Sequence, residues 1–242
     1  MPKYLGKSNS YVNKLDKDIE LDVLRRQTSS SYEFEGFDYW NSYEFMFQNN
    51  GQSCLACIEI KVPAHSKNIV ESKSLKLFLN KFYDQELQEP VISQYLSDLL
   101  SNHLDALVKV RFVHQFESAP DFIPLNYSTG LLHASTIYRF EGYRSLCPVT
   151  SQPDYANLYL ASDSFEKVDS KSIMNIIHSH MNQQAFHESC VEEIANDILT
   201  LSGITDFQIF GRFLRRGGID INPLRCFNST STMFQNFRDF NQ

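Results

Sequence analysis

The chain has 242 residues, of which 42% are hydrophobic and 21% charged, and its formal net charge at pH 7 is −7. This length accommodates one large domain or two of ordinary size, and the composition is that of a globular protein with packed cores. The negative net charge argues against non-specific binding to nucleic acid, because phosphate binding needs clustered Lys and Arg. A small-molecule ligand is therefore the favoured partner.

The sequence contains no run of about 18 apolar residues that could cross a bilayer, and its first residues lack the apolar segment of a signal peptide. Five cysteines, an odd number, fit reduced thiols better than a disulfide framework. We therefore expect a cytoplasmic protein. Cys54 and Cys57 form a C-x-x-C within an alternating run typical of a strand, where residues three apart point to opposite faces. Ordinary core or surface cysteines are favoured there over a redox or zinc pair.

The first part of the chain predicts a lead-in, a hairpin and two helices. Residues 1–40 are polar and rich in Ser and Tyr, and we expect them to be extended. The run N49-N-G-Q separates apolar runs at 43–47 and 55–62, which predicts a β-hairpin. A helix is expected in the stretch 70–84, and a second helix starts at Pro90. The apolar face of the first helix consists of Leu75, Phe78, Leu79 and Phe82.

The stretch V70-E-S-K-S returns as V168-D-S-K-S, 98 residues later. In the second copy the four face positions hold Ile173, Ile176, Ile177 and His180. A single duplication with a period near one hundred residues indicates two similar domains and not a solenoid.

The rest of the chain fits this duplication. A strand is expected at 107–116 and a boundary near 117–130, where Pro120 and Pro124 lie. In the second half we expect strands at 134–144, 155–161 and 206–213 and a helix at 188–202. We expect R215-R-G-G-I-D-I-N-P to form a polar loop and the tail from Phe227 to fray.

Each half then has helices on one face of an antiparallel sheet, which is an α+β arrangement. We expect an N-terminal domain at 1–120 and a C-terminal domain at 121–242. The groups that could carry chemistry are divided between the halves, so a site at an interface between domains or subunits would use all of them. The first half keeps Glu71, Lys73, Ser74 and Lys76, and the second holds Cys147, Asp154, His187 and Glu188.

Each motif also has an ordinary interpretation. The run C147-P-V-T-S-Q-P-D places a thiol and a carboxylate on either side of a turn, where the carboxylate could move the thiol's proton, but a buried Cys and a turn-capping Asp are common. The run F186-H-E-S-C-V-E-E fits an acidic helix N-terminus. His187 and Glu188 are adjacent and diverge on a helix, so they make a poor metal pair. The lysines of the first helix and the Arg215–Arg216 pair could be solvated surface.

Taken together, four ordered segments closely resemble the signature segments of the NADPH-dependent 7-cyano-7-deazaguanine reductases, which are nitrile reductases of queuosine biosynthesis. The segments are E71-S-K-S-L-K-L-F, C147-P-V-T-S-Q-P-D, F186-H-E-S-C-V-E and R215-R-G-G-I-D-I-N-P. Their order is similar to that in the two-module branch of the family. The resemblance runs from about Tyr43 to Pro223 and implies two tandem tunnelling-fold (T-fold) domains that associate side by side, in a homodimer.

The resemblance also implies a role for each matching residue. Cys147 would attack the nitrile as a thiolate and form a thioimidate, Asp154 would protonate the nitrile nitrogen, and His187 would assist later proton transfers. The implied substrate-binding residues are Glu71, Glu188, Phe186 and Ser72. The implied NADPH-binding residues are Lys73, Ser74, Lys76, Arg215, Arg216 and Gly217.

No G-x-G-x-x-G follows a strand, so a Rossmann domain is excluded as the cofactor site. We expect no metal and no direct nucleic-acid or membrane partner. Two alternatives remain open at this point. A pterin- or purine-processing hydrolase related to GTP cyclohydrolase would need Cys and His zinc ligands, and no suitable cluster is visible. A non-catalytic module that binds deazapurines would not need Cys147.

Overall fold

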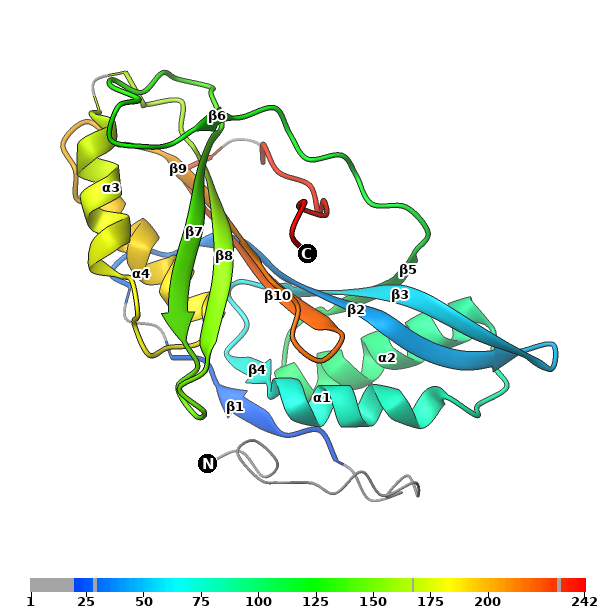
Figure 1. The fold of residues 1–242 in the computed structure, drawn as a ribbon. Coiled ribbons are helices and arrows are strands. Elements are labelled where there is room, and N and C mark those ends of the chain that lie inside the picture. The colour runs from blue at the N-terminus through cyan, green and yellow to red at the C-terminus, as the bar shows by residue number, and fades with distance from the viewer. Residues whose placement is uncertain (1–19, 28–29, 167, 230–231) are drawn as a thin grey trace. The chain divides into compact units, whose positions relative to one another are not determined.

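The computed structural model describes residues 20–27, 30–166, 168–229 and 232–242 (Figure 1). The chain folds into two compact units, each made of three separate segments. Unit 1 consists of Met1–Arg26, Trp40–Gln115 and Arg215–Asp220, and unit 2 of Gln27–Tyr39, Phe116–Leu214 and Ile221–Gln242. Both units combine helices with strands, which confirms the predicted α+β class. The division into domains at 1–120 and 121–242 stays a prediction, and residues 1–19 of the expected lead-in lie outside the described residues.

Unit 1 contains the predicted hairpin, formed by β2 (Glu35–Asn49, in this unit from Trp40) and β3 (Gln52–Pro63). Asn50 and Gly51 join the strands with φ angles of 52° and 73°, as a two-residue type I′ turn requires. Strand β5 (Lys109–Val113) lies antiparallel beside β3. The short strands β1 (Val23–Arg25) and β4 (Asn68–Val70) pair with each other.

The helices of unit 1 follow the predicted pattern. They are α1 (Ser72–Leu79), the 3₁₀ turn η1 (Asn80–Phe82) and α2 (Glu89–Leu104), which has Pro90 in its first turn. Leu75, Leu79 and Phe82 of the predicted apolar face are buried. The ring of Phe82 contacts that of Phe45 on β2, with a centroid distance of 5.3 Å. The period of the apolar residues therefore placed the helix face correctly.

Unit 2 is built on a sheet with the strand order β10-β9-β8-β7-β6. Its neighbours are antiparallel except for β6, which is parallel to β7. Two helices, α3 (Ser170–Ser179) and α4 (His187–Leu199), cover one face. The strands are β6 (Ile123–Pro124), β7 (Tyr138–Leu146), β8 (Pro153–Ala161), β9 (Phe207–Phe213) and β10 (Ile219–Phe227, in this unit from Ile221).

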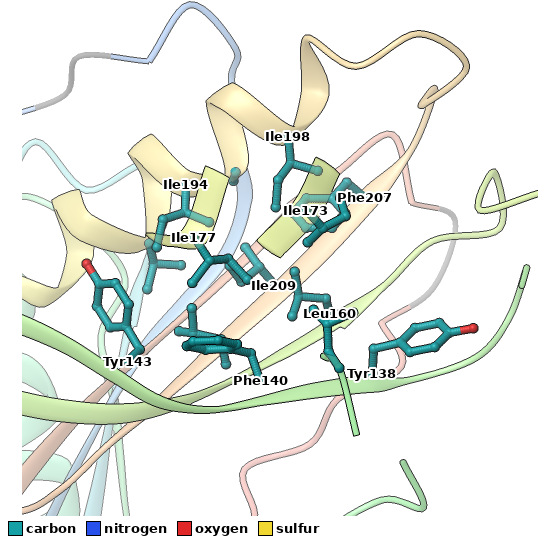
Figure 2. Packing of buried hydrophobic residues seen from close by; sticks show 14 of the residues in the cluster. Tyr138, Phe140, Tyr143, Leu160, Ile173, Ile177, Ile194, Ile198, Phe207 and Ile209 are labelled. Carbon is teal, nitrogen blue, oxygen red and sulfur yellow. The ribbon is translucent and has the colours of Figure 1, made fainter. Parts of the chain in front are cut away.

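The core of unit 2 lies between these two helices and the sheet, as Figure 2 shows. Ile173 and Ile177 of α3 and Ile194 and Ile198 of α4 are fully buried there. Their partners from the strands include Phe140, Leu160 and Ile209. Burying side chains of this size stabilises the fold by about 1.5–3 kcal/mol each, so this layer holds α3 and α4 against the sheet.

The repeat predicted from the sequence is visible as repeated local structure. Glu71 caps α1, with its two carboxylate oxygens accepting from the backbone N–H groups of Lys73 and Ser74, both at 2.8 Å. Asp169 caps α3 by accepting from the N–H of Lys171 at 3.0 Å. The longer Glu side chain reaches two N–H groups where Asp reaches one. In each half an antiparallel pairing with an earlier segment lies at this helix start: β4, which ends just before Glu71, pairs with β1, and the cap residue Asp169 itself pairs with Leu131.

Two predictions about the end of the chain are wrong. The segment expected to be a loop up to Pro223 becomes strand β10 at Ile219, because Ile219, Leu224 and Cys226 are buried and burial outweighs the polar, Gly- and Pro-containing sequence. The tail does not fray where it is described. Phe234 and Phe237 are each 1% exposed and pack in a second cluster with Phe210 of β9.

The lead-in is also shorter than expected, because β2 begins at Glu35. Tyr39 of this strand joins the same cluster as Phe234. None of the helices in the described part of the chain has the length and apolar character that crossing a bilayer requires.

Candidate active site

Cys147 follows β7 directly and opens the turn that leads into β8. Its N–H donates to the carbonyl of Gln152, and its carbonyl accepts from the N–H of Ser151, both at 2.9 Å. Ser151 has a φ of 54°, which closes the turn. Asp154 pairs with Ser145 across the two strands. Since alternate residues share a face of a hairpin, Cys147 and Asp154 lie on the same face as diagonal neighbours.

His187, the first residue of α4, is held on three sides. Its Nε2 lies 3.4 Å from Oδ2 of Asp154, and its Nδ1 lies 3.3 Å from the carbonyl oxygen of Ile221 on β10. Its ring stacks on Phe213, the last residue of β9, with a centroid distance of 3.8 Å and an interplanar angle of 4°. The structure thus brings Asp154 and His187 together within unit 2, and Cys147 follows the strand that pairs with Asp154.

These contacts determine where the imidazole carries hydrogen. A carbonyl oxygen can only accept, so Nδ1 of His187 is the donor to Ile221. Nε2 then faces the carboxylate of Asp154, and the side chains of Asp154 and His187 are 5% and 14% exposed.

Two other thiols of unit 2 are in surroundings unsuited to nucleophilic attack. Burial raises the pKa of Cys190 to about 11, and burial raises the pKa of Cys226 to about 11 as well. Both thiols are protonated at physiological pH, and only the thiolate is an efficient nucleophile. The thiol that shares a hairpin face with a carboxylate is Cys147.

Phe186 and Glu188 flank His187 at the start of α4. Phe186 is the N-cap residue, with φ −68° and ψ 155°, and Glu188 lies in the first turn. Glu188 is 3% exposed. An acidic residue in the first turn also complements the helix dipole, so the ordinary interpretation and the ligand-binding one both fit this position.

The predicted ligand-binding residues at the start of α1 are engaged with one another. Besides capping the helix, Glu71 accepts from the hydroxyl of Ser72 at 3.4 Å. Ser74 is fully buried, and its hydroxyl donates to the Glu71 carbonyl and accepts from the N–H of Asp22. In the structure these side chains hold α1 to the segment before β1, and their roles toward substrate and cofactor stay predictions.

The remaining cofactor candidates converge within unit 1. Gly217 and Gly218 turn the chain with φ angles of 59° and 79°. A Cβ placed on Gly217 would lie 3.5 Å from Nζ of Lys76, so the absence of a side chain leaves that ammonium close to the turn. The guanidinium of Arg215 lies 5.2 Å from the ring centroid of Tyr43 on β2.

This turn fits a phosphate-bearing cofactor. Lys76, Arg215 and Arg216 supply positive charge around a turn of two glycines, where backbone can approach a ligand closely. Lys73 precedes Lys76 by three residues and shares its side of α1. In the described residues, no group of three or more His, Cys, Asp or Glu is arranged to hold a metal ion.

Reasoning from the sequence missed two parts of the site. Phe213 is the last residue of an alternating strand, and its residue type and position indicate only a core residue, not a contact of the site. Ile221 contributes its backbone carbonyl, which every residue has, so no residue type could have indicated it. Both depend on how β9 and β10 meet α4.

Comparison with known proteins gives a consistent result. The family model described as "Nitrile reductase, 7-cyano-7-deazaguanine-reductase N-term" matches residues 8–112, and the model described as "QueF-like protein" matches residues 153–232. A Coxiella burnetii protein named NADPH-dependent 7-cyano-7-deazaguanine reductase is 32% identical over 269 residues, covering 98% of this chain and 96% of the relative.

Two further relatives carry the same name. The protein from Desulfotalea psychrophila is 32% identical, with 91% of each chain covered. The protein from Burkholderia pseudomallei is 30% identical, covering 98% of this chain and 97% of its own. The similarity thus extends over nearly the whole length on both sides, and it includes the segments that hold Asp154, His187 and the glycine turn. The chain belongs to the family of NADPH-dependent 7-cyano-7-deazaguanine reductases.

Proposed function

We propose that this protein reduces the nitrile of 7-cyano-7-deazaguanine to the primary amine of 7-aminomethyl-7-deazaguanine, in tRNA queuosine biosynthesis, with NADPH as reductant. The names of the full-length relatives support the reaction. The observation that carries the residue assignment is the proximity of His187 to Asp154, on the hairpin face that also presents Cys147.

Cys147 is the nucleophile of the proposed mechanism. A nitrile carbon is a weak electrophile, and covalent attack divides a difficult reduction into easier steps. The sulfur of Cys147 bonds to the nitrile carbon, and the proton of the thiol passes through Asp154 to the nitrile nitrogen. The product of this step is a thioimidate, with no net gain or loss of protons.

NADPH, when bound, supplies a hydride in each of two reductions. After the first, the bond between carbon and sulfur breaks, Cys147 leaves with the bonding electrons, and an imine remains. Each reduction also consumes one proton, which the Asp154–His187 pair donates: to the departing sulfur of Cys147 in the first and to the nitrogen of the imine in the second. Cys147 returns to its starting state after the imine forms, so the second reduction needs only the proton-donating pair.

The substrate and cofactor contacts complete the proposal. Glu188 accepts the paired N–H groups of the deazaguanine edge, and Phe186 stacks on the ring; an analogue without those N–H groups would leave a buried carboxylate unpaired. Glu71 and Ser72 are proposed as further substrate contacts. Lys73, Lys76, Arg215, Arg216 and Gly217 hold the cofactor phosphates. Because Ser74 is fully buried, its proposed contribution is to position α1.

The proposed fold and assembly follow the family. In each half two long strands precede two helices, which are followed by one or two strands, and this order supports tandem T-fold modules; the short strands β1 and β4 in the first half and β6 in the second are additional. We propose a cytoplasmic homodimer.

The test is to mix protein, nitrile and NADPH and follow cofactor oxidation and product together. We expect two NADPH oxidised per nitrile consumed. Without NADPH, intact-mass spectrometry of the wild type should show a covalent adduct that is absent in Cys147→Ala and present in the matched control Cys54→Ala. Nitrile binding without adduct in the wild type would refute the covalent mechanism. An oxidation ratio of one or zero would refute the reductase assignment and point to a hydrolase or a binding module.

A further inference from the structure

Phe213 pairs with Ala156 of β8 but lies beyond the end of the ladder between β9 and β10. The register between β9 and β10 pairs Phe207–Phe210 with Leu224–Phe227, so it stops three residues before Phe213. Beyond that point two side-chain amides take over. The N–H of Phe213 donates to Oδ1 of Asn222 at 3.0 Å, and Nε2 of Gln242 donates to the Phe213 carbonyl at 2.8 Å. Asn222 and Gln242 thus replace the missing strand neighbour.

The orientation of the Gln242 amide is determined by its surroundings. Its Oε1 accepts from Nε and Nη2 of Arg212, at 3.0 and 2.7 Å, and a guanidinium can only donate. Its NH₂ group must therefore face the Phe213 carbonyl and Oδ1 of Asn222, the latter at 2.7 Å. Arg212 and Asn222 are fully buried, and Gln242 is 6% exposed. Buried polar networks with all members satisfied are rigid.

This network lies on the face of the sheet opposite to the catalytic residues. Along β9, Phe207 and Ile209 belong to the core under the helices, whereas Phe210 packs with the tail. Alternation places Arg212 on the tail side and the ring of Phe213 on the helix side, where it stacks on His187. Asn222 is also the direct neighbour of Ile221, whose carbonyl holds Nδ1 of His187.

We propose that Gln242 and Asn222 are positioning residues for His187. Gln242 fixes the end of β9 and thereby the Phe213 ring, and Asn222 links that end to the part of β10 that presents the Ile221 carbonyl. The tail of the chain, packed on one face of the sheet, thus sets the imidazole geometry on the other. The catalytic part of this inference rests on the proposed function, and the positional part does not.

The positional part is tested by NMR of protein with ¹⁵N-labelled histidine, without substrate or cofactor. Stacking on Phe213 shifts the ring protons of His187 upfield, and the bond to Ile221 fixes hydrogen on Nδ1. In Gln242→Ala we expect most of the upfield shift to disappear and the nitrogen shifts to move toward a mixture of tautomers. Phe240→Ala, in the same tail with a side chain 93% exposed, is the matched control and should leave both signals in place.

Gln242→Glu provides a second variant should Gln242→Ala fail to fold. It keeps the size of the side chain and the contact to Arg212 but removes the N–H donor to Phe213, and we expect the same change in the His187 signals. Wild-type His187 signals in a folded Gln242→Ala or Gln242→Glu protein would overturn the proposal.

The catalytic part is tested by steady-state kinetics. We expect Gln242→Ala to lower kcat about tenfold to hundredfold, in the range that small misplacements of catalytic groups produce, while KM for the nitrile stays within about twofold. In a His187→Ala background the same substitution should have no further effect on kcat. An equal loss in both backgrounds would assign Gln242 a merely structural role and overturn the proposal. Changed His187 signals in a protein without nitrile reductase activity would instead refute the proposed function alone.

Discussion

Both ring nitrogens of His187 and one face of its imidazole each contact a different residue. The carbonyl of Ile221 fixes hydrogen on Nδ1, the ring of Phe213 fixes the plane, and Asp154 faces Nε2. In the proposed mechanism a group held in this way moves a proton at Nε2, so the proposed general acid is the pair and not either residue alone.

Replacing Asp154 with Asn removes the carboxyl while keeping its shape. The amide cannot pass the thiol proton to the nitrile nitrogen, so we expect adduct formation to slow by about 10²- to 10⁴-fold with nitrile affinity nearly unchanged. Stopped-flow absorbance gives the rate, and intact mass gives the yield. Asp121→Asn, an exposed carboxyl of the same unit, is the control. Adduct formation at the wild-type rate in Asp154→Asn would exclude the carboxyl from the proton transfer.

The buried thiol of Cys190 predicts a pH dependence of stability. Burial raises its pKa from 9.0 to about 11, so between these values the unfolded chain releases a proton that the folded chain keeps. The stabilisation is complete below pH 9 and is lost as the pH rises toward 11, by about 2–3 kcal/mol for this thiol. Urea unfolding from pH 7 to 11 should show the decline, and Cys190→Ala should decline less steeply. Parallel curves for the two proteins would contradict the assignment.

At the scale of elements, a buried ion cluster ties α4 to two strands. Nη1 of Arg225 on β10 lies 2.7 Å from Asp38 on β2, and its Nε lies 2.7 Å from Glu192 on α4. Burial alone would lower the pKa of Arg225, but the two carboxylates outweigh it and raise the pKa. Glu192 lies one turn after Glu188, so the same cluster anchors the end of the helix that carries His187.

Arg225→Met should therefore destabilise unit 2 strongly. The substitution leaves two carboxylates buried without their cation, and breaking a buried pair in this way costs about 3–5 kcal/mol. Lys171→Met, on the exposed side of α3, should change the free energy of unfolding by less than about 0.5 kcal/mol. Urea denaturation of the two variants measures the difference. A loss below about 1 kcal/mol for Arg225→Met would mean that the cluster has little net effect on stability.

At the scale of the whole molecule, neither unit is a continuous piece of chain. Unit 2 takes residues 27–39 from the N-terminal half, including Asp38, and unit 1 takes residues 215–220 from the C-terminal half. In unit 1 the borrowed Asp220 accepts from Asn41 at 2.8 Å and from Tyr43 at 2.6 Å. Because each unit includes a segment from the other half of the chain, cutting the chain at the predicted boundary near residue 120 tests that boundary directly.

A fragment of residues 121–242 should be much less stable than the same residues in the full chain. It lacks the strand that supplies Asp38, which leaves Arg225 with one of its two carboxylate partners. A synthetic peptide of residues 27–39 should restore structure when added, and the same peptide with Asp38→Ala should restore less. Far-UV circular dichroism and thermal melting measure both. A fragment that melts like the full chain without any peptide would show that the C-terminal half is independent.

The elements that the sequence predicted well are those with local signals. The Asn50-Gly51 turn and the apolar period of α1 each depend on neighbouring residues, and each is present. The position of Cys147 and Asp154 on either side of one short turn was also predictable, because it depends on local sequence alone. Strand β10 and the ordered tail were missed because their stability comes from burial against distant strands. The approach of His187 to Asp154 depends on that packing too, so only a family resemblance could indicate it.

The Asp154–His187 contact has a kinetic consequence for the proposed mechanism. Each of the two proposed reductions takes up one proton, and the pair is the proposed donor in both. A donor that has given its proton to the first reduction must regain one from water before it can serve the second. In the proposed cycle, water must therefore reach the His187 side chain, which is 14% exposed, between the two hydride transfers. The lifetime of the imine would then depend on hydration as well as on hydride transfer.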